Sequence, residues 1–441
     1  MIQTFVNAWK VPDLRKKLLF TLTIILLYRI GANLFIPYIS VDQVQAFSTF
    51  FGDGIFGMLS MMSGGAFSQG TFFALSVSPY ITASIVIQLL SIAIPALERL
   101  SKDEDGKKKL SAATRWVTVA LAVVTAYGYV NLFDMNGWLT VKKGDSNYVF
   151  AWFVMIACLC AGASLIMWLA EKINEHGIGN GISIILFANI ISGMTGTVQN
   201  TIGMLQDKYS EWKTGWDLVL GILGVILSIA LTLAAIVLIV WFTNSERRIK
   251  VIYAKKVVGR KTYGGQKTNL PLKMNMAGVM PVIFASSIVS IPATIAAFLP
   301  GTGFAKFVEA WLGATSPVYI IVFIALIVAF SYFYIAISFN PVEVANNIRN
   351  NGGAIIGIRP QEMAPFIKKI LNRVTLMGAI FLVVIAGTPL IANAIVSLIG
   401  VKFDSLAFTG TSLLIAVGVA LETVRDLEAQ LSMRNYKGFL D

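Results

Sequence analysis

Apolar stretches of about 20 residues recur along almost the whole chain, and this recurrence is the strongest constraint on its fold. A helix of that length crosses the hydrocarbon core of a bilayer. The chain is 56% hydrophobic and only 13% charged, which is more apolar than one soluble core requires. We therefore predict an all-α polytopic membrane protein with ten transmembrane helices. The ten stretches lie near 18–37, 75–96, 112–133, 149–170, 179–200, 217–243, 275–299, 317–339, 374–396 and 409–424.

Basic residues are concentrated in alternate loops between these stretches. If the N-terminus is cytoplasmic, the loops on that side hold the clusters 107–109, 247–256 and 368–373, whereas the opposite loops carry only scattered lysines. The positive-inside rule then places both termini in the cytoplasm. Most of the net charge of +12 is explained by this orientation next to anionic lipid. The basic N-terminus precedes a run long enough to span, so we predict a retained first helix and no cleaved signal peptide.

The cysteine, histidine and other potentially catalytic residues give no sign of a metal or catalytic site. Cys158 and Cys160 lie two apart in one apolar run and point to different helix faces, so we expect free thiols and no disulfide. The lone His176 has no neighbouring histidine or cysteine, and no metal is predicted. No phosphate-binding loop or catalytic dyad occurs, so we predict neither a cofactor nor an enzyme.

Ionisable residues are scarce within the predicted spans. Arg29 lies near the outer end of the first span, and Glu422, Arg425 and Asp426 cluster where the tenth span leaves the membrane. An ion-coupled transporter usually keeps carboxylates or histidines near the midplane. The scarcity of such groups counts against a secondary transporter of small solutes, which we keep as the alternative to a channel. An intramembrane enzyme is less favoured still, because it would need a base for one of the serines. A pore with an apolar constriction needs no such groups.

Between the first and second spans lies a glycine-rich segment that is too short to cross the membrane. The sequence GDGIFGMLSMMSGGAFSQG predicts a short helix from about Ile55 to Met62, ended by Ser63, Gly64 and Gly65. Such a half-helix is either an interfacial loop or a re-entrant piece buried in protein. Composition leaves both interpretations open.

Two spans carry an unusual number of polar residues and prolines. The second begins with Ser76, Val77, Ser78 and Pro79, and the seventh includes Asn275, Pro281, Ser286, Ser287 and Pro292. Polar groups at membrane depth require partners or water. These two helices are predicted to line a cavity or to meet each other, the alternative being kinks filled by neighbouring side chains.

Two loops on the basic side are too long to be plain connectors. The first, 244–274, alternates in the manner of a strand and contains Tyr263, Gly264 and Gly265, which predicts a short β-hairpin with its turn at these residues. The second, 340–373, includes Arg359 before Pro360. An acidic or nucleic-acid partner would suit both loops, although a merely solvated face is the alternative.

Five long segments resemble segments of the SecY family of protein-translocation channels, and they follow one another in the same order as in that family. They are SPYITASIVIQLL (78–90), EKINEHGIGNGISIILFANI (171–190), LPLKMNMAGVMPVIFASSIVSIPATIA (270–296), GIRPQEMAPFIKKILNRVTLMGAIFL (357–382) and FTGTSLLIAVGVALETV (408–424). The resemblance implies two pseudo-symmetric inverted halves, 1–200 and 217–441, joined by an external hinge at 201–216. It also implies a channel in the bacterial plasma membrane that passes unfolded secretory polypeptides and releases signal or transmembrane segments to lipid.

The resemblance further assigns roles to particular residues. It implies an apolar pore ring of Val77, Ile81, Leu186, Ile190, Ile283 and Ile415, which departs from all-isoleucine at two positions. It implies a lateral gate between the second and seventh helices with Thr82, Gln88, Asn275, Ser287 and Ile291. The segment 55–67 is implied to be a plug, with Ile55, Phe56, Met58, Leu59, Met61, Met62, Ser63, Gly64, Gly65 and Phe67.

The partners follow from the same resemblance. The two long loops would dock the ribosome and the SecA motor ATPase, which supplies the energy, and small SecE and SecG subunits would complete the channel. The docking residues implied are Arg247, Arg248, Lys255, Lys256, Arg260, Lys261 and Arg359.

Overall fold

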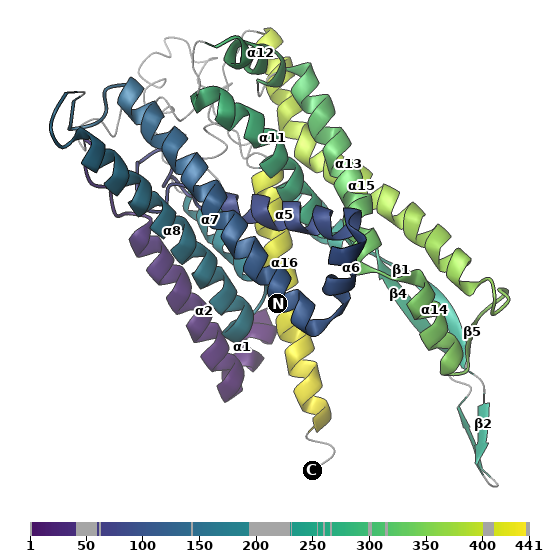
Figure 1. The fold of residues 1–441 in the computed structure, drawn as a ribbon. Coiled ribbons are helices and arrows are strands. Elements are labelled where there is room, and N and C mark those ends of the chain that lie inside the picture. The colour runs from purple at the N-terminus through teal and green to yellow at the C-terminus, as the bar shows by residue number, and fades with distance from the viewer. Residues whose placement is uncertain are drawn as a thin grey trace, which may run out of the picture.

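A computed structural model gives the fold of the chain (Figure 1). It describes residues 2–40, 60, 63–142, 144–193, 230, 232–253, 255–258, 261–264, 267–298, 302–313, 316–399 and 410–437. The predicted hinge at 201–216 lies outside these residues.

The first part of the chain is a group of helices packed side by side. It comprises α1 (Ile2–Lys10), α2 (Pro12–Gly31), α5 (Ser78–Ala93), α6 (Pro95–Lys102), α7 (Glu104–Met135), α8 (Tyr148–His176) and a further helix over Gly181–Gly193. Proline occupies the first turn of α2, α5 and α6, where its missing N–H costs no hydrogen bond. Helix α8 packs against both α7 and α2.

The second predicted span is broken. Helices α5 and α6 meet at an angle of 111°. Ile94 between them is extended, with φ −110° and ψ 112°, because the ring of Pro95 disfavours a helical conformation at the preceding residue. The helix in the predicted span near 75–96 therefore ends at Ala93, and α6 leaves it in a different direction.

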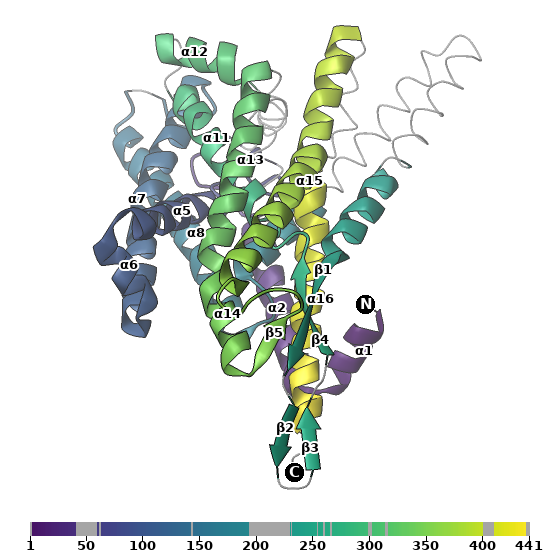
Figure 2. The same cartoon turned by 90° about the vertical axis from the view of Figure 1, so that its right-hand side faces the viewer.

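The second part of the chain adds a helix over Thr232–Asn244 and a second packed group. This group contains α11 (Met280–Phe298), α12 (Gly303–Leu312), α13 (Pro317–Ser338), α14 (Pro341–Asn350), α15 (Met363–Ile399) and α16 (Gly410–Lys437). Helix α12 lies across the end of the bundle opposite the strands (Figure 2). The side chain of Asn340 caps α14 by accepting hydrogen bonds from the N–H groups of Val342 and Glu343.

The two long loops form one small platform at the opposite end. Strands β1 (Glu246–Tyr253) and β4 (Lys267–Lys273) pair antiparallel, and β5 (Gly353–Ile355) from the second loop pairs with β1, giving the order β4-β1-β5. Ile249, Val251 and Ile355 pack with α14 and α15 in a separate core. The sequence had predicted the hairpin but not that the second loop completes its sheet.

The hairpin turn is not where the sequence analysis put it. Strands β2 (Lys255–Val258) and β3 (Lys261–Gly264) form the distal pair, with Lys255 opposite Gly264 and Lys256 opposite Tyr263. Tyr263 and Gly264 are therefore strand residues, and the chain reverses between Val258 and Lys261. Tyrosine favours strands, and its pairing with Lys256 outweighed the turn tendency of the glycines that follow.

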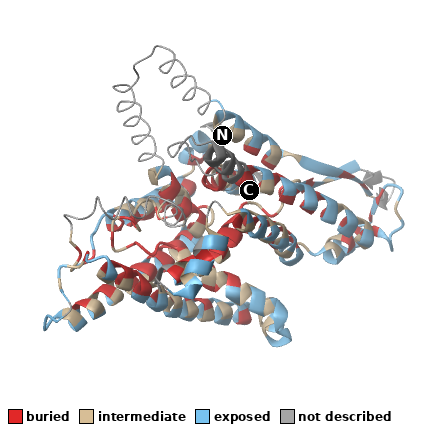
Figure 3. Cartoon of the chain, turned by 90° about the horizontal axis from the view of Figure 1, so that it is seen from above, coloured by how far each residue is buried: buried red, intermediate tan, exposed pale blue. Residues whose placement is uncertain are grey.

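The helices are suited to a membrane. Among the described residues, four helical stretches are long and apolar enough to span: Glu104–Met135, Tyr148–His176, Pro317–Asn350 and Met363–Gly387. The bent α5–α6 pair makes a fifth if it counts as one span, and shorter apolar helices cover Gly181–Gly193, Thr232–Asn244 and Met280–Ala296. Buried residues gather where the helices face one another, and the outer surfaces are exposed (Figure 3). The full count of ten spans remains a prediction.

Candidate functional site

The six residues of the predicted pore ring are all buried in the same large apolar core. They come from the start of α5, from the helix Gly181–Gly193, from α11 and from α16. Each is at most 4% exposed, and all belong to the same apolar core: Val77, Ile81, Leu186, Ile190, Ile283 and Ile415. The six side chains therefore belong to one continuous apolar core, to which both parts of the chain contribute.

Local geometry explains how this cluster is assembled. Val77 and Ile81 are four residues apart, as are Leu186 and Ile190, so each pair lies on one face of its helix. Ser76 adopts a left-handed conformation with φ 50°, which is unusual for a serine and turns the chain into α5. The strained residue thus sets where Val77 and the helix after it enter the core.

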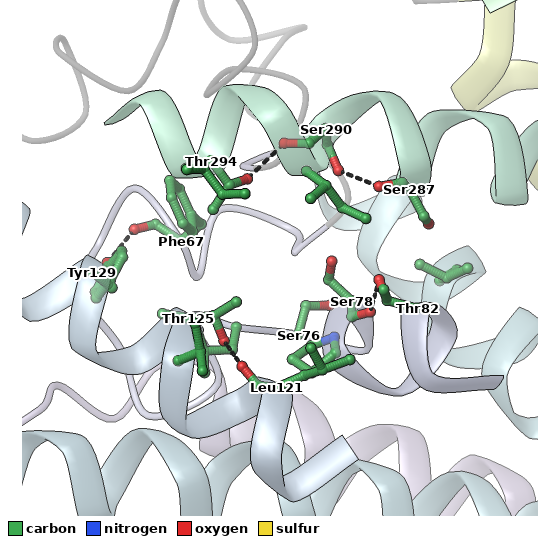
Figure 4. Close-up of a pocket in the computed structure, with 17 residues that line it drawn as sticks. Phe67, Ser76, Ser78, Thr82, Leu121, Thr125, Tyr129, Ser287, Ser290 and Thr294 are labelled. Atoms are coloured by element: carbon green, nitrogen blue, oxygen red, sulfur yellow. Dashed lines mark hydrogen bonds between the residues drawn. The ribbon is translucent and has the colours of Figure 1, made fainter. Parts of the chain in front are cut away.

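A cavity of about 220 Å³ lies beside this cluster, between α5, α7 and α11 (Figure 4). Three of the predicted gate residues line it: Thr82 from α5, and Ser287 and Ile291 from α11. Leu186 of the ring cluster and Phe67 of the predicted plug line it as well. The cavity therefore joins the predicted gate, ring and plug in one place.

Three of the hydroxyl groups that line this cavity donate to carbonyls of their own helices. Thr82 donates to the Ser78 carbonyl at 3.0 Å, Ser290 to that of Ser287 at 2.8 Å, and Thr294 to that of Ser290 at 2.8 Å. Figure 4 shows these bonds running along each helix. The Ser287 hydroxyl is buried and has no hydrogen-bond partner within the described structure. These hydroxyls therefore do not tie α5 to α11.

Two further predicted gate residues lie away from the cavity. The Gln88 amide donates to the Ser84 hydroxyl at 3.2 Å within α5. Asn275 precedes α11 and lines a second, very small cavity with Ser331 of α13 and Thr375 of α15. The structure therefore brings Thr82, Ser287 and Ile291 together and leaves these two outside the group.

The described part of the predicted plug is a compact turn. Ile55, Phe56, Met58, Leu59, Met61 and Met62 lie outside the described residues. The Ser63 hydroxyl donates to the Ser60 carbonyl and accepts from the Phe67 N–H, both at 2.9 Å. Gly64 and Gly65 have φ of +65° and +87°, which glycine adopts without strain. The Tyr129 hydroxyl holds the turn from α7 by donating to the Phe67 carbonyl at 2.5 Å.

This turn rests on a seat of polar side chains that the sequence analysis did not assemble. A Cβ atom added at Gly64 would lie 2.9 Å from the Arg29 guanidinium and 3.1 Å from the Asn189 backbone. Arg29 donates to the Ser192 hydroxyl, and Asn189 donates to the Ser76 hydroxyl at 3.3 Å. The seat therefore connects α2, the helix Gly181–Gly193 and Ser76, two residues before α5.

One signal for the seat was present in the sequence. Arg29 is the charged residue of an apolar span, and a charge at that depth needs a polar partner. Its second terminal nitrogen is buried and makes no hydrogen bond in the described part of the chain. The partners could not be read from the sequence because Ser192 and Asn189 lie 163 and 160 residues away from it.

The predicted docking residues lie on the platform. Arg247 and Arg248 are exposed on β1, and Arg248 forms an ion pair with Glu246 at 2.6 Å. Lys255, Lys256 and Lys261 belong to the distal strands, while Arg260 lies outside the described residues. Arg359 is exposed in the turn between β5 and α15, on the other loop. The platform thus carries basic residues from both loops.

The described residues contain no group of three or more His, Cys, Asp or Glu side chains that could hold a metal ion. Cys158 and Cys160 are free thiols on α8.

Comparison with known proteins gives consistent matches. The family model described as SecY matches residues 71–424. A curated relative, the protein translocase subunit SecY of Streptomyces scabiei, is 42% identical, and the match covers 100% of both chains.

Solved structures agree on the fold. One, titled as a study of how the plug domain of the SecY protein stabilises the closed state of the translocation channel, has a TM-score of 0.63 at 18% identity and covers 94% of this chain and 92% of its own. Sec61 in the canine ribosome–channel complex has a TM-score of 0.60 at 17% identity, with the same coverage of both chains.

Proposed function

The chain belongs to the SecY family of protein translocase subunits, and we propose that the buried cluster of six ring residues is the constriction through which it passes polypeptides. The protein is the channel subunit of a translocase and spans the membrane several times. SecY is not a known enzyme family, and the work of translocation falls to partners.

The burial of the six side chains in one core is the observation that supports this constriction. They are apolar and buried, so in this arrangement they exclude water and ions from the centre of the bundle. Apolar side chains of this kind seal by close packing without binding any one substrate group strongly. A ring that adapts to many sequences is what a general polypeptide channel requires.

The test is disulfide trapping of a stalled secretory chain that carries one cysteine. Single cysteines at Ile81, Ile283 and Ile415 are introduced in a background with Cys158 and Cys160 replaced by serine. Ile321→Cys on α13 is the matched control, because this isoleucine is 66% exposed on the outer surface. We expect cross-links at the three ring positions and none at the control. A folded channel that cross-links equally at all four positions, or at none, would refute the assignment.

The seam between α5 and α11 is our proposal for the lateral exit. Thr82, Ser287 and Ile291 line its cavity, whereas Gln88 and Asn275 lie outside it and are not part of this proposal. An apolar segment of about 20 residues that reaches this seam gains about 25 cal/mol per Å² on leaving water for lipid, whereas a polar segment does not. Signal sequences and membrane helices would therefore leave sideways while polar chain continues through.

The turn at Ser63–Phe67 is our proposal for the anchored end of a plug. It packs through Ala66 into the same core as the ring residues. Glycines at its apex allow it to lie close against Arg29 and Asn189, so its seat depends on shape as well as on hydrogen bonds. Residues 55–62 would complete the plug.

The platform is our proposal for the docking surface of the ribosome and of the SecA motor. A solved structural relative is a channel in a ribosome complex, and the basic residues of both loops suit an RNA or acidic surface. Docking there requires a cytoplasmic platform, and hence cytoplasmic termini in the plasma membrane. SecE and SecG are the small subunits we expect beside the bundle.

Replacing Arg359 by glutamate tests the platform. We expect Arg359→Glu to slow SecA-driven secretion while the channel itself still inserts and folds. Arg349→Glu is the matched control, because Arg349 is also exposed but lies on α14 of the same loop. Secretion at the normal rate in Arg359→Glu, or equal loss in both variants, would contradict a specific role for Arg359.

A further inference from the structure

Helix α12 connects the far ends of α11 and α13, at the end of the bundle opposite the platform (Figure 2). It lies across that end, whereas α13 runs along the bundle. The Thr302 hydroxyl caps it by accepting from the Ala305 N–H. A helix that lies across the end of a membrane-spanning bundle is suited to the boundary between lipid and water.

One face of α12 is packed on protein. Val308 is 2% exposed and forms a small core with Ala293 and Ala296 of α11. Ala305 and Leu312 join this core, at positions three before and four after Val308. The helix is therefore fixed to the end of α11 along a defined stripe, and its other faces point away from that contact.

A second face of α12 is aromatic and uncovered. Phe304, Phe307 and Trp311 are 44%, 56% and 53% exposed. Their spacing of three and four residues places them on one stripe, and the Phe307 and Trp311 rings stack with their centroids 6.4 Å apart. Three large aromatic side chains on a ten-residue helix form a patch that water does not favour.

The polar side of α12 faces the other way. Lys306 is exposed and lies two residues after Phe304, which is about 200° around the helix. Ile321, one turn into the neighbouring helix α13, is likewise apolar and 66% exposed. Aromatic rings on one side and a lysine on the other match the lipid–water boundary, where aromatic side chains gather and lysine reaches toward phosphate.

We propose that α12 is an interfacial helix that binds the phospholipid headgroup layer of the leaflet farthest from the platform. Phe304, Phe307 and Trp311 lie among the upper acyl chains, and Lys306 faces water and headgroup phosphate. Through the Val308 stripe, this lipid contact holds the end of α11. The inference rests on the membrane location of the chain and not on the proposed gate, so either can fail without the other.

The experiment places one spin label at a time on α12 in the complete translocase complex. The variants are Phe304→Cys, Lys306→Cys and Val308→Cys, with Cys158 and Cys160 replaced by serine, in nanodiscs of phosphatidylethanolamine with a minor fraction of phosphatidylglycerol. Collision rates are measured with oxygen, which concentrates in lipid, and with a water-soluble nickel chelate. Val308→Cys reports the signature of a site packed in protein.

We expect the label at 304 to meet oxygen several-fold more often than the nickel chelate, and the label at 306 to show the reverse. Equal access to the nickel chelate at both positions would mean that the aromatic stripe faces water, which overturns the proposal. Exclusion of both reagents at 304, as at 308, would mean that a protein subunit covers it, which also overturns the proposal. If Phe304→Cys does not fold, Trp311→Cys gives the same reading from the same stripe.

Discussion

The seat of the plug turn and the seam between α5 and α11 are two polar regions inside one apolar bundle. Their polar side chains differ in whether they form hydrogen bonds between elements or within one helix. In the seat, hydrogen bonds run between elements: Arg29 to Ser192, Asn189 to Ser76 and Tyr129 to Phe67. At the seam, the hydroxyls of Thr82, Ser290 and Thr294 bond to carbonyls of their own helix. Polarity alone therefore does not tell whether two elements are held together.

The difference has an energetic meaning. Separating elements that share hydrogen bonds leaves donors and acceptors unpaired, which costs about 1–3 kcal/mol for each buried group. Helices whose hydroxyls are already satisfied internally lose only packing when they part. The seat is thus the tied region and the seam the separable one, and the following variants test that division.

The largest effect is expected in the seat, from Gly64→Ala. Its φ of +65° disfavours any side chain, and the added methyl would lie within 3.1 Å of Arg29 and Asn189. We expect the seated turn to lose about 2–4 kcal/mol, measured by thermal unfolding and by ion conductance in planar bilayers.

Gly65→Ala is the control for that change. Gly65 has a φ of +87°, but an added methyl would find its nearest neighbour, Gln69, 3.7 Å away. This variant carries the backbone strain alone, about 1–2 kcal/mol. Equal losses in the two variants would show that the seat does not press on the turn.

A smaller effect is expected from the Arg29–Ser192 hydrogen bond. A double-mutant cycle with Arg29→Gln and Ser192→Ala should give a coupling free energy of about 1–2 kcal/mol, because the donor is charged and partly buried. The free energy of unfolding of the four proteins in detergent measures it. If the losses of the two single variants simply add in the double variant, this hydrogen bond does not stabilise the seat, and the contrast between seat and seam is weaker.

A still smaller effect, of opposite sign, is expected at the seam from Ser287→Ala. The Ser287 hydroxyl is buried without a hydrogen-bond partner in the described structure, so removing it should stabilise the protein by up to about 1 kcal/mol. Ser290→Ala, whose hydroxyl bonds within α11, serves as the control and should be close to neutral. A clear loss of stability in Ser287→Ala would reveal a bond that ties the seam.

The smallest effect is expected from Thr82→Val, which keeps the shape of the side chain. The loss of its bond to the Ser78 carbonyl is offset by a methyl that faces an apolar cavity. The free energy of unfolding should change by less than about 0.5 kcal/mol, as measured by the shift in melting temperature in detergent. A drop of several times that size would mean that the Thr82 hydroxyl has a second role across the seam.

The length of the apolar stretches allowed most of what could be predicted about the fold. Each apolar stretch contains a described helix, because lipid-facing helices must be apolar along their whole length. Pro95 is the sequence signal for the break between α5 and α6, but it stands at the end of a long apolar run whose length dominates the pattern. Length and composition were informative, and breaks inside a run required attention to single residues.

The candidate site was predictable only in part. The resemblance brought together the ring residues, which the structure buries in one core, and their role as a pore ring stays a prediction. It also grouped Gln88 and Asn275 with the seam, whereas their hydrogen bonds and neighbours lie elsewhere. The seat around Arg29 was missed because its partners are distant in sequence, and pairing of that kind leaves no local pattern.

The pairing of β5 with β1 has a mechanical consequence. Because β4 leads through a few residues into α11 and β5 leads into α15, the shared sheet couples two helices that the chain otherwise connects only through α12, α13 and α14. A force applied to either loop is therefore transmitted to both helices through the shared sheet. A partner that displaces the distal hairpin would therefore move α11 and α15 together.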